Sequence, residues 1–353
     1  MKEAAFARGG IDAYHGRARF RAPRSLEVAG ELLDARFILV AAGAVPMRIG
    51  IPGEEHLLTS TEFLELQRLP ERVAMLGGGY IAAELSHIAA RAGARVTVIE
   101  QAERMLLAFD PDLVELLAKK FRELGIDVRL GTRVTGVERR GEAFSVSASS
   151  NGKEVSIEAD LVVHAAGRVP DLEPLDLAAA GVALRNGRLE LNQFLQSATN
   201  SAVYAAGDTA SSGPPLTPVA SHDARVAAAN MLQGNHVRPD YLGVPSVAFT
   251  VPPIAAVGLT EQLAREQGLR FRMKHLDAAG WYTARRVAET VYGFKVLVEE
   301  ASERILGAHL VGPHADEVIN VFALAIRHGL SAQQLKDTIF AYPSGASDIG
   351  YML

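Results

Sequence analysis

Three consecutive glycines, set between a strand pattern and a helix pattern, constrain the fold of this chain more than any other feature. Residues 73–76 form a short apolar run typical of a buried strand, and residues 77–79 are all glycine. Residues 80–91 then place apolar side chains at helical spacing, with Gly93 where a helix C-terminal cap belongs. Residues 95–99 alternate as a second strand. Strand, helix and strand in this order predict a right-handed parallel crossover, and therefore an α/β fold.

The glycines also fit a dinucleotide-binding pattern, G-x-G-x-x-A. Gly77 would allow the tight turn, Gly79 would let the backbone approach a pyrophosphate, and Ala82 would allow close packing of helix on strand. The pyrophosphate would face the N-terminus of the helix, where free N–H groups and the helix dipole favour anions.

An acidic residue follows at the distance that such a site requires. Glu100 ends the second predicted strand about 20 residues beyond Gly79, where an acid can bond the 2′-hydroxyl of an adenosine ribose. A carboxylate there repels a 2′-phosphate, so the sequence favours NAD(H) over NADP(H). Arg104, in the same predicted loop, could weaken this discrimination. The alternative for Glu100 is a surface residue that only ends a strand.

Small residues end three predicted strands in a similar way. Residues 38–46 and 162–170 both run from an apolar strand into Ala-Ala-Gly, one variable residue and Val-Pro, and residues 203–208 end in Ala-Ala-Gly-Asp. Open α/β sheets bind nucleotides at the carboxyl ends of their strands, where small side chains let a ligand approach. An ordinary turn is the alternative for any single copy. From about residue 241, strands are followed by a helix without a new glycine loop, which predicts an α+β C-terminal domain.

Composition excludes several classes of function. The formal net charge is −5 and the basic residues are scattered, so neither a nucleic-acid nor a membrane partner is expected. The 353 residues contain no cysteine, which excludes disulfides, thiolate metal sites and a cysteine nucleophile within them. The histidines and carboxylates show no metal-ligand spacing, so no metal site is predicted. The apolar segments are too short for a membrane span or a signal peptide, and a cytoplasmic location is expected.

Several motifs in order resemble the pyridine nucleotide-disulfide oxidoreductases, the family of glutathione reductase, dihydrolipoamide dehydrogenase and mercuric reductase. The motifs are residues 38–43, 51–53, 77–84, 165–170, 205–208 and 216–220. The resemblance implies doubly wound, Rossmann-like FAD-binding and NAD(P)-binding domains, followed by an α+β dimerisation domain that forms a homodimer. The expected boundaries are residues 1–68 and 157–240 for a partial FAD-binding domain, 69–156 for the NAD(P)-binding domain and 241–353 for the dimerisation domain.

The resemblance also implies cofactor-binding roles for individual residues. On the NAD side the candidates are Gly77, Gly79, Tyr80, Ile81, Glu84, Glu100, Gly167 and Arg168. On the FAD side they are Ala42, Gly43, Asp208, Thr217, Pro218, Val219 and Ala220. Tyr80 would be a mobile lid between the nicotinamide pocket and the flavin, and Glu84 matches a glutamate that pairs, in the family, with a lysine near the flavin. Asp208 would bond the ribityl or phosphate part of FAD, and the helix from Thr217 would point its N-terminus at the isoalloxazine. Packing at a strand end or helix end is the alternative for each.

The sequence departs from the family pattern in two places. The family's first G-x-G-x-x-G loop, its two redox cysteines and its flavin lysine have no counterpart here, so an incomplete flavin site is expected. Near the C-terminus, Tyr342, Pro343 and Ser344 stand where the family has His-Pro-Thr, and Ser347 and Asp348 stand where it has a glutamate. A phenol, with a pKa of about 10, is a poorer base at neutral pH than an imidazole, with a pKa of about 6.5. Tyr342 and Asp348 are therefore weak catalytic candidates, with packing as the alternative.

The whole pattern favours a flavin-dependent NAD(P)H oxidoreductase that transfers hydride between NAD(P)H and FAD and passes electrons to a small-molecule acceptor that the sequence leaves open. The alternative is a non-catalytic, NAD-binding and dimerising fragment, or one half of a split enzyme.

Overall fold

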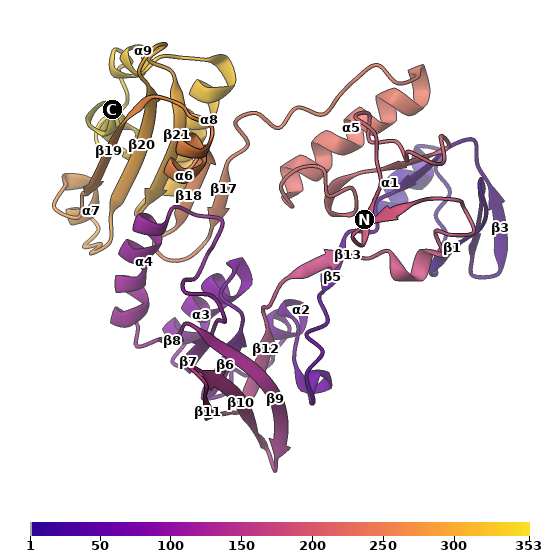
Figure 1. Ribbon diagram of the computed structural model, residues 1–353, viewed down its shortest axis with the longest axis horizontal. Coiled ribbons are helices and arrows are strands. Elements are labelled where there is room, and N and C mark those ends of the chain that lie inside the picture. Colours follow the sequence, from indigo (N-terminus) through magenta and orange to yellow (C-terminus); the bar gives the residue numbers. More distant parts are fainter. Residues whose placement is uncertain (1) are drawn as a thin grey trace. The chain divides into compact units, whose positions relative to one another are not determined.

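The computed structural model describes residues 2–353, which divide into two compact units (Figure 1). The first unit consists of the chain up to Val45 together with Arg168–Tyr241. The second consists of Pro46–Gly167 and Leu242–Leu353. Each unit is therefore assembled from two separate stretches of sequence.

In the first unit, a pair of parallel strands carries two of the small-residue ends. Strand β4 (Ile38–Val40) pairs in register with β16 (Val203–Ala205), and helix α5 (Thr217–Gln233) packs against β16. Phe20 and Leu195 fill the core beside these strands. An antiparallel sheet of the same unit consists of β1 (Ala18–Ala22), β2 (Ser25–Val28) and β3 (Glu31–Asp34). The remaining elements of the unit are α1 (Lys2–Arg8), β13 (Arg168–Pro170), η2 (Glu173–Leu175), β14 (Leu184–Arg185), β15 (Arg188–Leu189) and η3 (Gly207–Thr209). Strand β5 (Ala44–Pro46) begins in this unit.

The second unit contains the predicted strand, helix and strand. Its parallel sheet has the order β12-β6-β7-β8, with β6 (Arg72–Leu76) in the interior and β7 (Arg95–Ile99) beside it. Helix α3 (Tyr80–Arg91) connects these two strands. The other strands are β8 (Asp127–Arg129) and β12 (Leu161–His164), and helix α4 (Pro111–Glu123) precedes β8.

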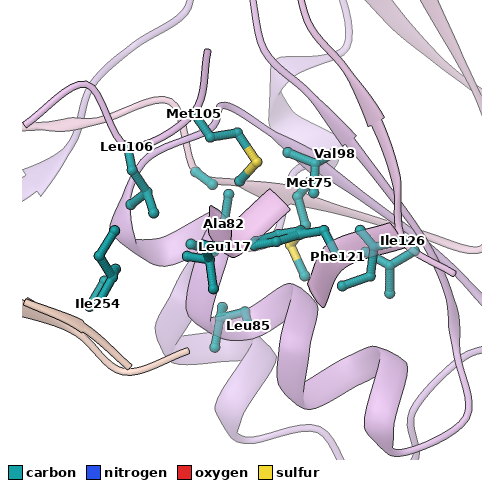
Figure 2. Packing of buried hydrophobic residues seen from close by; sticks show 14 of the residues in the cluster. Met75, Ala82, Leu85, Val98, Met105, Leu106, Leu117, Phe121, Ile126 and Ile254 are labelled. Atoms are coloured by element: carbon teal, nitrogen blue, oxygen red, sulfur yellow. The ribbon is translucent and has the colours of Figure 1, made fainter. Parts of the chain in front are cut away.

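Helices α3 and α4 pack on the parallel sheet through one apolar core. Figure 2 shows Met75 and Val98 from the sheet against Leu117 and Phe121 from α4. Ala82, the small third position of the glycine pattern, is fully buried in the same core, because a larger side chain would hold α3 away from β6.

A three-stranded antiparallel sheet flanks the parallel sheet. It has the order β11-β10-β9, from β9 (Thr132–Arg140), β10 (Ala143–Ser150) and β11 (Lys153–Ala159). The preceding segment forms η1 (Glu54–His56) and α2 (Ser60–Leu64).

The C-terminal region is a five-stranded antiparallel sheet covered by helices. Its order is β17-β18-β21-β20-β19, and α8 (Ala315–His328) packs on β18 and β21. The strands are β17 (Ser246–Ala248), β18 (Ile254–Gly258), β19 (Phe271–Asp277), β20 (Gly293–Glu299) and β21 (Ile305–Val311). The further helices are α6 (Glu261–Glu266), α7 (Tyr282–Arg285), α9 (Ala332–Lys336), η4 (Gly345–Asp348) and α10 (Ile349–Met352).

The predicted α/β class with an α+β C-terminal region is confirmed. The predicted domain boundaries stay a prediction, and the two compact units are divided differently from them. Residues 46–68 and 157–167 belong to the second unit, since Leu58 bridges to Val163 and β12 extends the sheet beside β6. In the described part of the chain, no helix has the length and apolar character needed to cross a membrane.

Candidate dinucleotide-binding site

The glycine loop begins with a position that only glycine can occupy. Gly77 follows β6 with a φ of +112°, and its N–H donates to the carbonyl of Ile99 at 2.8 Å. A Cβ atom at residue 77 would lie 2.3 Å from the carbonyl oxygen of Ala165. The close approach of these two strand ends therefore requires Gly77.

The second glycine is held by the acid that the sequence analysis singled out. The N–H of Gly78 donates to Oε2 of Glu100 at 2.5 Å, and the N–H of Ala102 donates to Oε1 at 2.7 Å. A Cβ at residue 78 would lie 2.9 Å from the same carboxylate. Glu100 therefore links the glycine loop to the loop that follows β7.

The third glycine leaves the start of α3 open. Gly79 is the N-cap of the 12-residue helix α3 without any side-chain cap, so the first N–H groups of the helix have no partner from that position. A Cβ at residue 79 would contact nothing within 4 Å. This open, positively polarised helix end fits a pyrophosphate.

A cavity of about 260 Å³ adjoins the loop at the carboxyl ends of β6 and β7. Glu100 lies in its wall together with two arginines that the sequence analysis missed, Arg48 and Arg133. The full lining is Met47, Arg48, Ile49, Ile51, Leu76, Gly77, Ile99, Glu100, Gln101, Thr132, Arg133, Val134 and Ala166.

The side chain of Arg104 binds carbonyl groups of its own loop. Its guanidinium donates to the carbonyls of Leu106 and Phe109, each at 3.1 Å, and of Leu107 at 2.9 Å. It therefore stabilises the turn after β7, and it does not line the cavity beside Glu100.

The predicted site residues of α3 have different partners, and Glu84 binds the C-terminal region. The Tyr80 ring lies 5.2 Å from the Phe109 ring, and burial raises the pKa of Tyr80. The Glu84 carboxylate accepts the N–H of Phe249 at 2.8 Å. Ile81 is half-buried against the apolar core.

Two more polar side chains of α3 bind the same segment. Nδ1 of His87 accepts the N–H of Val251 at 3.1 Å, and Arg91 donates to the carbonyl of Val251 at 3.0 Å. Burial lowers the pKa of His87 to about 4, so the ring is neutral at pH 7 and its Nδ1 can accept. Glu84, His87 and Arg91 thus bind the main chain of residues 249–251, and we call them the α3 polar stripe.

The flavin-side candidates of the first unit gather around the ends of β4 and β16. The carbonyl of Gly43 accepts from Oγ1 of Thr209 at 3.2 Å, while Ala42 is exposed. A Cβ at Gly207 would lie 2.8 Å from Cβ of Ala220, so the start of α5 packs directly on the end of β16. Within residues 2–353, the half-buried Asp208 carboxylate makes no hydrogen bond.

The start of α5 also leaves donors for a ligand. Thr217 and Pro218 are exposed at its first positions, Val219 is buried, and Leu216 supplies no side-chain cap. These features suit the ribityl and ring portions of a flavin: the Asp208 carboxylate makes no hydrogen bond among the described residues, the strand ends carry small residues, and the N-terminus of α5 is uncapped.

Asp223 is a residue of this region whose role the sequence analysis missed. It is fully buried, and its carboxylate accepts the Gly207 N–H at 3.1 Å and the Tyr241 hydroxyl at 2.8 Å. Burial and this carboxylate raise the pKa of Tyr241. His222 instead accepts the N–H of Asp240 at 3.1 Å, so His222 and Asp223 have separate partners.

Gly167 and Arg168 follow strand β12, at the second of the small-residue strand ends. Gly167 has a φ of +116°, and its carbonyl accepts the Met47 N–H at 3.0 Å. Arg168 belongs to the first unit, where it donates to the carbonyl of Ala44.

The C-terminal catalytic candidates contact different side chains. Tyr342 is 77% exposed and stacks on Tyr282, with ring centroids 6.2 Å apart. Asp348 accepts the hydroxyl of Tyr292 at 2.7 Å, and burial together with this carboxylate raises the pKa of Tyr292. The chain as described does not bring Tyr342 and Asp348 together through a shared partner.

Comparison with known proteins covers nearly the whole chain. A family model described as pyridine nucleotide-disulphide oxidoreductase matches residues 3–224, and a model of that family's dimerisation domain matches residues 244–352. Glutathione reductase from Burkholderia cepacia is 31% identical over 96% of this chain and 74% of its own length. The solved structure of the HOCl-induced flavoprotein disulfide reductase RclA from Escherichia coli has a TM-score of 0.88 at 29% identity, over 97% of this chain and 79% of that chain.

Mercuric reductases are also similar, although they are much longer. The protein from Staphylococcus aureus is 36% identical over 94% of this chain and 61% of its own length. The protein from Bacillus cereus is 36% identical over 94% of this chain and 53% of its own length. The chain thus spans little more than half of these relatives.

Proposed function

Because the chain belongs to the pyridine nucleotide-disulphide oxidoreductase family, we propose that it binds NAD(H) and FAD and acts in hydride transfer between them, with a small molecule as the final acceptor. The observation that carries this proposal is the loop Gly77–Gly79, which combines a required close turn with an open helix N-terminus and a carboxylate beside it.

The chain's own groups bind and orient the dinucleotide. The N–H groups at the start of α3 hold the pyrophosphate, because they are unpaired and lie at the positive end of the helix dipole. Glu100 accepts from the ribose hydroxyls, as an acceptor-only group can. Since its charge opposes a 2′-phosphate, NAD(H) is the preferred cofactor.

FAD, when bound, supplies the electron chemistry. Asp208 and the start of α5 from Thr217 to Ala220 would hold it, with Ala42 and Gly43 at the neighbouring strand end. The 353 residues themselves carry no cysteine. The match to the family's dimerisation domain supports a homodimer through residues 244–352.

A glycine substitution tests the dinucleotide site without disturbing the fold. Gly79→Val places a side chain in open space at an ordinary φ of −83°, so it fills the pyrophosphate cradle and leaves the packing unchanged. Isothermal titration with NADH should show one site per chain in the wild type and at least about a tenfold weaker affinity in Gly79→Val.

Gly280→Ala is the matched control, because a Cβ there also meets nothing within 4 Å and residue 280 lies outside the cavity. It should bind NADH as the wild type does, and both variants should melt within a few degrees of it. Wild-type protein that does not bind NADH, or Gly79→Val that binds it unchanged, would contradict the proposed site. Titration with FAD, followed by the change in its visible spectrum, tests the flavin side separately.

A further inference from the structure

A second cavity, of about 380 Å³, lies between helix α4, the loop that follows β7 and strand β8. It shares no lining residue with the cavity beside Glu100, and the candidate cofactor residues lie outside its wall. Its volume exceeds the roughly 300 Å³ at which small-molecule sites in proteins begin. We call it the α4 cavity.

The floor of the α4 cavity is apolar. Helix α4 contributes Leu117 and Phe121, the loop after β7 contributes Met105 and Leu106, and Ile126 lies just before β8. All five side chains are labelled in Figure 2, and each is 6% exposed or less. A phenyl ring and a thioether are groups that contact an aromatic ring favourably. The floor therefore suits a flat aromatic body.

The rim of the α4 cavity is charged and has one acid without a partner. Arg122 pairs with Glu115 at 3.2 Å, and Asp127 pairs with Arg129 at 2.8 Å. Glu103 is exposed, and within residues 2–353 its carboxylate takes part in no ion pair or hydrogen bond. The ionisable side chains of the wall sum to one net negative charge, from Glu103, Arg104, Glu115, Arg122 and Asp127. A cation is therefore the charge that this rim complements.

One residue of the floor also holds the glycine loop. Leu106 has a φ of +50°, in the left-handed region that a bulky side chain rarely adopts. Its side chain lines the α4 cavity, while its N–H donates to the carbonyl of Gly78 at 2.8 Å. The carbonyl of Leu106 accepts from the N–H of Phe109 at 2.9 Å and from Arg104 at 3.1 Å. The backbone conformation at residue 106 thus affects both the cavity and the glycine loop.

We propose that the α4 cavity binds an aromatic amine in its protonated form, and that this occupant strengthens dinucleotide binding through Leu106. The ring fills the apolar floor, and the ammonium group faces Glu103. The amine site stands on the cavity alone, whereas its effect on the dinucleotide rests on the proposed function.

The effect follows from the strained backbone of Leu106. Its left-handed conformation costs free energy, which contacts elsewhere must offset. An occupant of the cavity contacts the Leu106 side chain only while that side chain lies in the wall, and in the same conformation the N–H holds the Gly78 carbonyl. Two ligands that favour one conformation strengthen each other's binding by the same factor.

Three indole compounds test the site without flavin or turnover. Tryptamine, tryptophol and indole-3-acetate share the ring and end in an ammonium group, a hydroxyl and a carboxylate, respectively. Each is titrated by calorimetry into the wild type, Glu103→Gln and Ala118→Phe. Ala118 is half-buried in the cavity wall, so a phenyl group there fills the space. Glu142→Gln is the matched control, since Glu142 is also exposed and lies outside the cavity.

The expected result is a preference for the cation. The wild type and Glu142→Gln should bind tryptamine about two- to fivefold more tightly than tryptophol, and indole-3-acetate more weakly than either. Glu103→Gln should bind tryptamine and tryptophol alike, and Ala118→Phe should bind none of the three. Added salt should reduce the preference of the wild type. All variants should melt within a few degrees of the wild type.

A second titration measures the effect on the dinucleotide. Saturating tryptamine should tighten NADH binding to the wild type at least about threefold, and saturating NADH should tighten tryptamine binding by the same factor. In Ala118→Phe, tryptamine should leave NADH binding unchanged.

The outcomes that would overturn the inference are distinct. Absence of tryptamine binding, equal binding of the three compounds or a preference for indole-3-acetate would overturn the amine site. Tryptamine binding that leaves NADH affinity unchanged would overturn the effect through Leu106. A wild type that binds tryptamine as expected but does not bind NADH would instead overturn the proposed function, and the amine site would stand.

Discussion

The ammonium group of Lys295 lies 3.0 Å from Oδ2 of Asp110, and both side chains are about 1% exposed. Lys295 projects from β20, while Asp110 is the N-cap of α4. Asp112 and Glu261 also contact the ammonium group, at 2.5 and 3.3 Å. This group of charges, buried at Lys295 and Asp110, fixes the start of α4 on the C-terminal sheet.

Lys295→Met should destabilise the protein strongly, because it leaves the Asp110 carboxylate buried without its cation. We expect the free energy of unfolding in urea to fall by about 3–5 kcal/mol. The control is Lys119→Met, which removes a half-exposed ion pair with Asp277 and should cost less than about 1 kcal/mol. Similar losses in the two variants would contradict this account of the buried group.

His87 should make stability depend on pH in the acid range. Its pKa in the folded protein is about 4, below the ordinary value of 6.5, so the unfolded chain takes up a proton first as the pH falls. The contribution of neutral His87 to the free energy of unfolding is complete above pH 6.5. It is lost progressively as the pH falls to about 4, by up to about 3 kcal/mol.

His87→Gln keeps an acceptor for Val251 but cannot titrate, so its unfolding free energy should change less between pH 6.5 and 4. Burial also lowers the pKa of His309, and that part of the pH dependence should remain in the variant. A profile that His87→Gln does not flatten would show that the ring is not held neutral by the fold.

Glu100→Gln should shift cofactor preference in a definite direction. It removes the one negative charge of the cavity and retains an oxygen that can accept from Gly78 or Ala102. The ratio of the NADPH to the NADH dissociation constant should therefore fall about tenfold. The measurement is the quenching of protein fluorescence by each cofactor, and a constant or rising ratio would mean that Glu100 does not face the 2′ position.

Asp223→Asn should loosen the flavin side of the first unit. The amide can accept from only one of the two donors that the buried carboxylate serves, Gly207 N–H and Tyr241 hydroxyl. We expect a loss of about 2–3 kcal/mol and faster hydrogen exchange around residues 206–209. Tyr241→Phe, which removes one donor and leaves the carboxylate bonded to Gly207, should have the smaller effect. Exchange at these amides as slow as in the wild type would count against a positioning role for Asp223.

The parts of the molecule that were predictable are those set by local pattern. The apolar run before Gly77, the helical spacing after it and the alternation before Glu100 all act over a few residues, and the structure contains that strand, helix and strand. The family resemblance, which rested on motifs in a fixed order, is confirmed by the two family models.

The residues that could not be predicted depend on contacts between distant segments. Arg48 and Arg133 reach the same cavity only because the end of β7 bonds Thr132 and because Met47 is tied to the segment after β12. Lys295 lies in an apolar strand pattern and gives no sign of burial until Asp110 is placed beside it. The family partner of Glu84, a lysine, has no counterpart in this sequence, and only the structure shows that Glu84 binds the N–H of Phe249.

The α3 polar stripe binds residues 249–251 entirely through their main chain, and this has a consequence for how the segment can vary. The side chains of Phe249 and Val251 are 62% and 48% exposed, so they point away from the groups that hold their backbone. Any residue other than proline can supply the same N–H groups at these two positions. Substitutions can therefore change the exposed side chains at residues 249 and 251, while the hydrogen bonds that attach the segment to the dinucleotide-binding helix stay the same.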